Sequence, residues 1–447
     1  MTEGSDGRRT DKGTATGGTR NKRTDAYGNG YDCRSGSWSG YDEAIRDEWR
    51  ILNGWLTRAR CAVELRILNP PGKPGRKFEY PPSLIQYLLM QKESGGASYR
   101  AGCARCAGLL EGLGLAAPSY STLHKSEMRF FGGGLGTEVM EKASAVLAEM
   151  GVAEEFDPVV FLRSGAFPEY SAPQKIPVCQ RDVEEQASAD AEAAGMREMM
   201  EVMVSKEHAS HGRRVEGAAD GSGEGTTGSG IYMEHIWGVG DRCFVKQHAL
   251  VDTVTMDIVA FSVTMETPGD AKVLPPLIEG CRSMGVGLAK VTADSAYDTR
   301  ENWRRAADAG VEFVPNLKAT FRDDSEIPER RELRLLEERL GKSTAHRVTG
   351  YSLRWLVESF FSAFKRLYGD RVSSRKFARM VLTMRTRYIL YAVHRRTILK
   401  HVSGHRLDDC LMTDTHESRY KELFNTVYGK APLPHMGLTS VTNVPFR

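Results

Sequence analysis

Two aspartates stand at the ends of apolar segments in the central part of this 447-residue chain. Asp220 closes the segment V-E-G-A-A-D and precedes G-S-G, and Asp294 closes the segment L-A-K-V-T-A-D. If both segments are strands, their final side chains point into the crevice where open α/β sheets place their sites. Mg²⁺ prefers oxygen ligands, and two such ions can activate an attacking oxygen and stabilise the leaving one. The two aspartates therefore favour metal-dependent phosphoryl transfer.

A third acid stands in the segment Y-S-L-R-W-L-V-E-S-F-F-S-A-F-K. In helical geometry Tyr351, Arg354, Glu358 and Lys365 fall on one face, with an apolar stripe beside it. Glu358 would then border the core next to a cationic face. The alternative is an amphipathic surface helix, in which an Arg and Glu pair four residues apart adds a few tenths of a kcal/mol, about 0.2–0.5.

Two further aspartates compete for a place in this site. Asp298 follows Asp294 by four residues, and with Glu301 three residues on it matches a capping pair at the start of a helix. We therefore predict that Asp294 binds metal and that Asp298 caps a helix. Asp252, in A-L-V-D-T-V-T-M-D, fits a hairpin turn, where aspartate is common for local hydrogen bonding, and it is the weaker candidate.

The charge of the chain is concentrated in one segment. Between residues 351 and 400 there are 12 Lys and Arg against two acids, a local charge of +10 in a chain whose net charge is +3. Clustered cations of this kind favour contact with the phosphates of DNA. The alternative is an ordinary solvated helix face, although such faces usually carry charges of both signs.

The bulk composition excludes several classes. No stretch approaches the roughly 18 apolar residues of a membrane span, and the first residues have no signal-peptide core, so we expect a cytoplasmic protein. Eight cysteines lack framework spacing. Cys103 and Cys106 have no second pair to complete a zinc site, and we interpret them as small apolar residues on a helix.

Secondary structure divides the chain into a helical half and a half rich in strands. Pro81 and Pro82 fit the start of a helix, and Ser98 and Ser121 fit helix caps. Turn residues separate the predicted strands, and a mixed sheet flanked by helices follows from their alternation with helical patterns. The predicted strands are 215–220, 231–237, 243–251, 258–264, 288–293 and 311–314.

The signature segment resembles a family of enzymes. Tyr, two residues, Arg, three residues, Glu, six residues and Lys is the spacing typical of a large branch of bacterial and archaeal insertion-sequence DDE transposases. The order A-D-G-S-G-E-G-T-T-G-S-G, F-V-K-Q-H-A-L-V-D, D-I-V-A-F-S-V-T and V-T-A-D-S-A-Y-D is similar to that of their catalytic domain. The resemblance covers about residues 80–130 and 211–400.

This resemblance implies an RNase H-like fold with Asp220, Asp294 and Glu358 as the catalytic and metal-binding triad for Mg²⁺ or Mn²⁺, with two ions expected. It implies that Tyr351, Arg354 and Lys365 contact the transposon end. The expected reaction is cleavage of DNA at terminal inverted repeats followed by strand transfer into target DNA, by a homodimer or higher multimer at the nucleoid. A catalytically inactive relic that binds DNA and a host nuclease on the same fold are the alternatives.

The resemblance and the composition together divide the chain into five parts. The N-terminal helices could form a helix-turn-helix or a plain bundle. The roles of the head and of the acidic stretch 181–201 stay open. The parts are a disordered Gly/Ser/Arg-rich head (1–40), an N-terminal helical DNA-binding or dimerisation region (41–135), a connecting helical and acidic linker region (136–212), an RNase H-like DDE catalytic domain (213–400) and a C-terminal tail (401–447).

Overall fold

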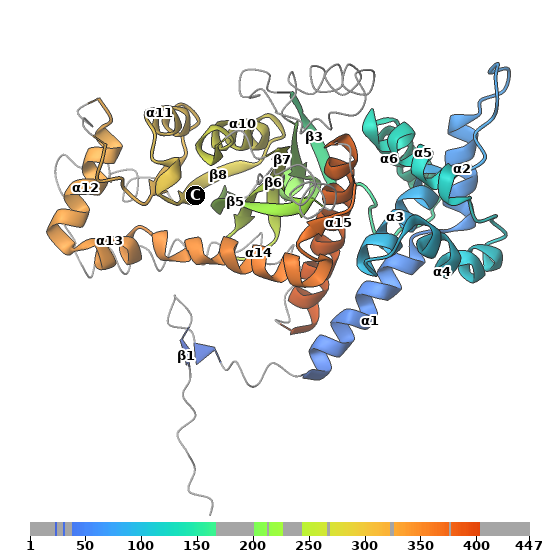
Figure 1. Cartoon of the computed structure of the whole chain (residues 1–447), viewed down its shortest axis with the longest axis horizontal. Helices are drawn as coiled ribbons and strands as arrows, with labels where there is room; N and C mark the ends of the chain where they lie inside the picture. The colour runs from blue at the N-terminus through green and yellow to red at the C-terminus, as the bar shows by residue number, and fades with distance from the viewer. Residues whose placement is uncertain are drawn as a thin grey trace, which may run out of the picture.

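The computed structural model describes residues 23–24, 30–31, 38–166, 201–211, 214–226, 244–265, 269–321, 326–374 and 377–402. Most of the predicted head and tail, nearly all of the acidic stretch and the predicted strand 231–237 lie outside these residues. In Figure 1 a central sheet has the N-terminal helices on one side and α12 and α13 on the other. Within the described ranges, no helix combines the length and apolar character that a membrane crossing needs.

The N-terminal region is helical, as predicted. Pro82 is the first residue of α3, and Ser98 caps α4 by accepting a hydrogen bond from the Ala101 N–H. The cap of α5 is Ser119 rather than the predicted Ser121, because the helix begins one residue after Ser119. The elements are β1 (Arg23–Thr24), β2 (Gly30–Tyr31), α1 (Trp38–Gly54), α2 (Arg58–Leu68), α3 (Pro82–Ser94), α4 (Tyr99–Gly112), α5 (Tyr120–Glu127), the π-helical turn η1 (Met128–Gly132) and α6 (Leu135–Glu149).

The central sheet has the order β3-β4-β7-β6-β5-β8-β9, with β10 beside β5. Strands β5, β6 and β7 form an antiparallel meander, and β8 and β9 continue the sheet parallel to β5. This arrangement confirms the predicted mixed sheet. The strands are β3 (Phe161–Ala166), β4 (Glu201–Ser205), β5 (Arg214–Thr226), β6 (Phe244–Asp252), β7 (Ile258–Met265), β8 (Gly287–Ala293), β9 (Glu312–Pro315) and β10 (Arg371–Val372).

Strands β3 and β4 lie in the segment that we predicted as a linker, 136–212. They pair with each other, and β4 extends the sheet at β7. Val202 and Val204 of β4 are fully buried, so the apolar surface of this strand is part of the core. The segment therefore supplies the outermost strand of the sheet, β3, and its neighbour β4, in addition to connecting the helical region to the sheet.

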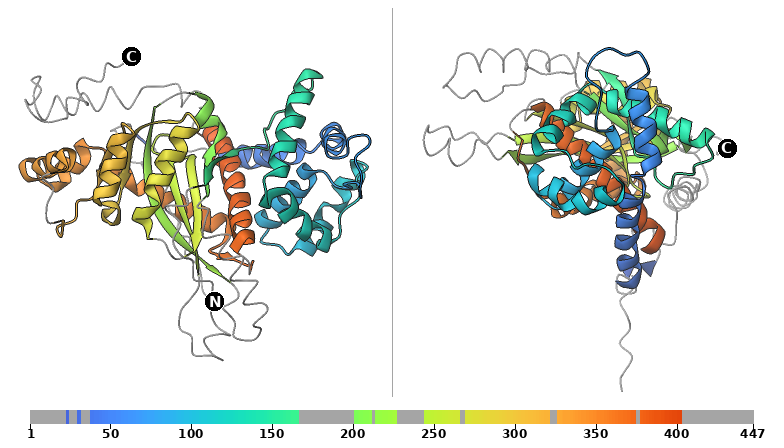
Figure 2. Two further views of the ribbon diagram at one scale, coloured as in Figure 1. Left: turned by 90° about the horizontal axis from the view of Figure 1, so that it is seen from above. Right: turned by 90° about the vertical axis from the view of Figure 1, so that its right-hand side faces the viewer.

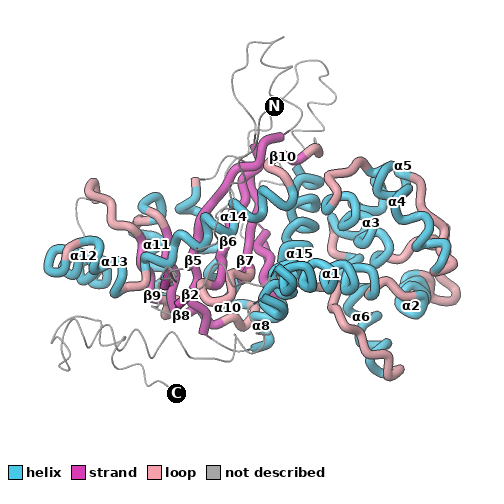
Figure 3. Tube along the Cα trace, turned by 90° about the horizontal axis from the view of Figure 1, so that it is seen from below, coloured by secondary structure: helices cyan, strands magenta, loops and turns pink. Residues whose placement is uncertain are grey.

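Helices cover both faces of the sheet (Figure 2). Ala219 of β5 packs in one core with Leu277 of α10, whereas its neighbour Ala218 packs in another with Val357 and Phe360 of α14. Figure 3 shows α14 running across β5 and β6. The remaining elements are α8 (Lys206–His211), η3 (Asp270–Lys272), α10 (Leu274–Ser283), η4 (Ser295–Tyr297), α11 (Arg300–Asp308), α12 (Pro328–Leu340), α13 (Lys342–Val348), η5 (Tyr351–Arg354), α14 (Trp355–Tyr368) and α15 (Phe377–Val402).

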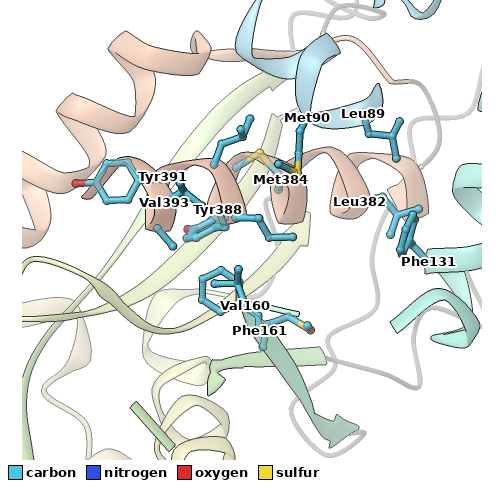
Figure 4. Packing of buried hydrophobic residues seen from close by; sticks show 14 of the residues in the cluster. Leu89, Met90, Phe131, Val160, Phe161, Leu382, Met384, Tyr388, Tyr391 and Val393 are labelled. Atoms are coloured by element: carbon cyan, nitrogen blue, oxygen red, sulfur yellow. The ribbon is translucent and has the colours of Figure 1, made fainter. Parts of the chain in front are cut away.

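Helix α15 lies between the sheet and the N-terminal helices. Tyr388 stacks on Phe261 of β7 with ring centroids 3.8 Å apart, and Figure 4 shows Met384 beside Met90 of α3. One continuous core therefore joins the helical region to the sheet. Cys103 and Cys106 lie buried and unoxidised on α4, in keeping with their interpretation as small apolar residues.

Candidate active site

Asp220 and Asp294 lie side by side on two inner strands, at the edge of the sheet where β8 ends. Ala219 of β5 is in register with Ala293, the last residue of β8, in a parallel pair, so Asp220 within β5 lies next to Asp294, which follows β8. The Asp220 Oδ1 accepts a hydrogen bond from the Gly221 N–H at 2.8 Å, and the Asp294 Oδ1 accepts one from the Ala296 N–H at 2.7 Å. Each carboxylate is thus oriented by the backbone that follows it.

Arg354 links Glu358 to Asp220 at this edge of the sheet. The Arg354 Nη1 lies 3.2 Å from the Asp220 Oδ2, while the Nη2 donates to the Glu358 Oε1. Glu358 is on the first turn of α14, and its side chain is 55% exposed, against 18% for Asp220. The guanidinium therefore joins one acid of the sheet to one acid of the helix.

The edge of the sheet carries excess negative charge. Burial raises the pKa of Asp220 to about 6, and the nearby Asp294 and Asp270 add to this rise, against the Gly221 N–H and Arg354, which lower it. Tyr297 is buried in the same place, and burial together with these three acids holds its pKa well above the usual value. An arrangement of this kind attracts cations.

The donor set fits a divalent cation in its chemistry, because all three predicted ligands are carboxylates and the Asp220 site is short of positive charge. Across the described ranges, however, no three Asp, Glu, His or Cys side chains lie close enough together to hold an ion. Arg354 stands between Asp220 and Glu358. A metal held by both acids would require Arg354 to release one of them.

Two other signature residues also have partners within the protein. The Lys365 Nζ donates to the Gly223 carbonyl of β5 at 2.8 Å, which ties α14 to the strand that carries Asp220. Tyr351 is half-buried, and its ring lies 4.2 Å from that of His346. Contact of Tyr351, Arg354 and Lys365 with DNA stays a prediction.

The helix-capping role predicted for Asp298 is wrong. Thr299 caps α11 by accepting from the Asn302 N–H, while Asp298 is buried and forms an ion pair with Arg330 at 2.8 Å. Asp298 also accepts from the Trp303 Nε1 and the Lys318 N–H. A local pattern suggested the cap, but the buried carboxylate needs the more distant cation.

Asp252 is the turn residue that its sequence context indicates. It ends β6, and its side chain accepts from the Val254 N–H and from the Thr255 hydroxyl, both at 2.9 Å. The bonds are local, as expected for an aspartate at a hairpin turn.

In the described part of the basic segment 351–400, not every cation is free to contact phosphate, which corrects the expectation from its charge. Several cations of α15 form ion pairs with acids of other elements instead. The reason is that α15 is enclosed by the sheet and the N-terminal helices, so its charged side chains meet their acids. The pairs are Arg379 with Glu127, Arg387 with Glu93, Arg396 with Asp257 and Lys400 with Asp47.

Sequence reasoning missed Asp270, which lies beside Gly221 and within electrostatic reach of Asp220. Asp270 begins η3, shortly after β7 ends. Its signal was available, because Asp270 comes shortly after the predicted strand 258–264, much as Asp294 comes directly after the predicted strand 288–293. Tyr297, in the segment A-D-S-A-Y-D, was missed as well.

Residues 211–393 match the family model of the transposase DDE domain. The matched segment begins at the end of α8, extends into α15 and contains every residue predicted for the site. No curated protein matches the sequence. Among solved structures, the chain is similar to one described as a crystal structure of a pre-cleavage Mos1 transpososome, at 13% identity and a TM-score of 0.21 over 76% of this chain and 82% of that one.

Proposed function

We propose that the protein is a transposase that cleaves DNA at the ends of a mobile element and transfers the freed ends into target DNA. The observation that carries the proposal is the placement of Asp220, within β5, beside Asp294, which directly follows the parallel strand β8, with Glu358 joined to Asp220 through Arg354. The match of residues 211–393 to the transposase DDE domain supports it.

Asp220, Asp294 and Glu358 would hold the metal, Mg²⁺ or Mn²⁺, most simply as two ions. Bound there, the ions would activate the attacking oxygen and stabilise the leaving oxygen of a phosphodiester. The Gly221 and Ala296 N–H groups orient the two aspartates, and Arg354 holds Glu358 near them. Because both cleavage and strand transfer are phosphoryl transfers, one set of carboxylates can serve both steps.

The partner in this proposal is double-stranded DNA with terminal inverted repeats, followed by target DNA. Tyr351 and Arg354 lie on η5 and Lys365 lies on α14, the helix that carries Glu358, and in this proposal the three side chains contact the strand being cut. Arg354 has a planar fork that suits a phosphate, and Lys365 acts as a point charge. Two ends held together would require at least a dimer, and such an enzyme would work at the nucleoid.

The test uses the full chain and labelled fragments of the DNA that flanks its gene. We expect cleavage that depends on Mg²⁺, and Asp220→Asn, Asp294→Asn and Glu358→Gln should each reduce it by about a hundredfold or more, since metal contacts are worth several kcal/mol. Fragment binding without metal should stay near normal. Asp308→Asn is the matched control, because Asp308 is an exposed acid on α11.

Binding without any cleavage by the unmodified chain would favour the alternative function, a catalytically inactive relic that binds DNA. Near-normal cleavage by any one of the three variants would remove that residue from the site. The absence of inverted repeats from the flanking DNA, together with metal-dependent cleavage, would favour a nuclease on the same fold.

A further inference from the structure

Asp270 supports β5 on the face opposite to Asp220. Successive side chains of a strand point to opposite faces, so Gly221 faces away from Asp220. A Cβ atom placed on Gly221 would lie 2.3 Å from the Asp270 Oδ1 and 3.1 Å from the His248 Nδ1. Real atoms do not approach this closely, so the absence of a side chain at Gly221 admits the Asp270 carboxylate.

Asp270 is itself held by the neighbouring strand. The Lys246 Nζ forms an ion pair with the Asp270 Oδ1 at 2.7 Å, and the fully buried His248 places its Nδ1 3.3 Å from the same oxygen. His248 is directly opposite Gly221 in the β5–β6 register, and its Nε2 lies 3.0 Å from the Thr264 hydroxyl of β7. Three strands of the meander therefore fix where the Asp270 carboxylate lies.

The position of Gly221 matters because its N–H donates to the Asp220 Oδ1 at 2.8 Å. A shift of the Gly221 backbone would move this donor and release the Asp220 carboxylate. Asp270 also begins η3, which packs against η4, the short helix capped by Asp294. Asp270 thus lies between the Gly221 backbone, which orients Asp220, and η4, which is capped by Asp294.

We propose that Asp270 is a positioning residue of the active site: held by Lys246, it packs against Gly221 and so keeps the Gly221 N–H in place to orient the Asp220 carboxylate. The inference rests on the proposed function, because that function gives Asp220 its role. Asp270 acts through Gly221 and does not touch the reacting atoms.

The first arm of the test needs no activity. Crystal structures of the metal-free full chain are compared for the unmodified protein, Asp270→Ala and Glu279→Ala, an exposed acid of α10 in an ion pair with Arg282. In Asp270→Ala the Gly221 N–H to Asp220 Oδ1 bond should be lost or displaced, and in Glu279→Ala it should be kept. Gly221→Ala should also lower the Tm by several degrees, and adding Asp270→Ala should recover much of that loss, because the clash is removed. An unmoved Asp220, or no recovery, would overturn the inference.

The second arm measures cleavage of the flanking fragments. Asp270→Ala should lower kcat about tenfold, the equivalent of one misplaced hydrogen bond, with KM for the fragment changed less than about twofold. Asp270→Asn keeps the volume and an acceptor oxygen, so most of the rate should return. A loss in Asp270→Asn as large as in Asp270→Ala would mean that the charge itself acts at the site, and would overturn a positioning role. Failure of the unmodified chain to cleave would count against the proposed function, and the first arm would still decide whether Asp270 positions Asp220.

Discussion

Charged side chains are arranged differently at the edge of the sheet that carries Asp220 and in the buried ion pairs that join other elements. We call these buried pairs the supports. At the edge, Asp220 and Glu358 share a single arginine, and Glu358 is more than half exposed. In the supports, Asp298 with Arg330 and Glu93 with Arg387 form buried pairs in which each side chain is less than a tenth exposed. A buried pair is costly to break, whereas an exposed charge such as that of Glu358 can exchange partners. Replacements in the supports should therefore affect stability, and replacements at the edge should affect chemistry.

The largest loss of stability is expected for Asp298→Ala. The change removes the carboxylate that faces the buried Arg330 guanidinium, together with the acceptor of the Trp303 and Lys318 donors. Breaking a buried pair from one side costs about 3–5 kcal/mol. Urea denaturation should find a loss of this size in the free energy of unfolding. Asp294→Ala should lose only about 1 kcal/mol with its capping bond to Ala296, but should abolish cleavage. Equal losses of stability would contradict the comparison.

A smaller loss is expected for Arg387→Met in α15. Arg387 pairs with Glu93 at 2.9 Å and donates to the Arg371 carbonyl, so the variant leaves a buried acid on α3. Glu93 keeps its contact with Lys92, which should hold the loss near the lower end of the range, about 3 kcal/mol. Thermal unfolding measures this effect. DNA affinity of the folded variant should stay within about twofold, and a large fall would place Arg387 on the DNA surface instead of in a support.

The difference between edge and supports also explains what the sequence predicts and what it misses. Asp220 and Asp294 were predictable because each ends an apolar segment. Asp294 does follow its strand, but the prediction that a strand ends at Asp220 is wrong, because residues 221–226 continue β5 and pair with β6. The capping role of Asp298 failed because Arg330, its partner, is 32 residues away and no local pattern reports it. Likewise, the charge of α15 suggested a phosphate-binding surface, since the acids that pair with it come mostly from the N-terminal helices and β7 region. Strands β3 and β4 were missed because each is short, and because β4 begins at the end of the acidic stretch.

Glu224 is intermediate between the edge and the supports, because it is a buried acid of β5 only four residues from Asp220. Its Oε1 accepts from the Gln247 Nε2, but among the described residues its Oε2 has no hydrogen-bond partner. Burial raises the pKa of Glu224 to about 7, although Lys365 and Arg387 oppose the rise. The folded protein thus retains a proton that the unfolded chain loses from its ordinary pKa of 4.5 upward.

Stability contributed by the protonated Glu224 should therefore be complete below pH 4.5 and be lost as the pH rises through 7. Glu224→Gln removes this dependence, so the stability of the variant relative to the unmodified chain should increase over that window, by at most about 3 kcal/mol. Chemical denaturation at several pH values measures the difference. A constant difference between pH 4 and 8 would indicate that Glu224 ionises normally in the fold.

The smallest effect is expected at Lys365, which lies near the edge of the sheet and, like a support, joins two elements. Its Nζ donates to the Gly223 carbonyl, but an ammonium has three donors, and two are left for a DNA phosphate. Lys365→Ala should lose about 0.5–1.5 kcal/mol of stability with the hydrogen bond. If the charge also meets a phosphate, the slope of log affinity against log salt should fall in magnitude by about one. Lys365→Gln separates the two roles, because it keeps an N–H donor and loses the charge.

Metal-free titrations of the flanking fragments should then give a reduced salt slope for both Lys365 variants and reduced stability for Lys365→Ala alone. The metal must be left out because Arg354 and Glu358 lie near Lys365 on the same helical segment, and cleavage would obscure the binding measurement. A slope unchanged in both variants, with stability lost only in Lys365→Ala, would make Lys365 a support that fixes α14 to β5. The edge would then have Arg354 as the one signature cation available to DNA, and even Arg354 would first have to leave its two carboxylates.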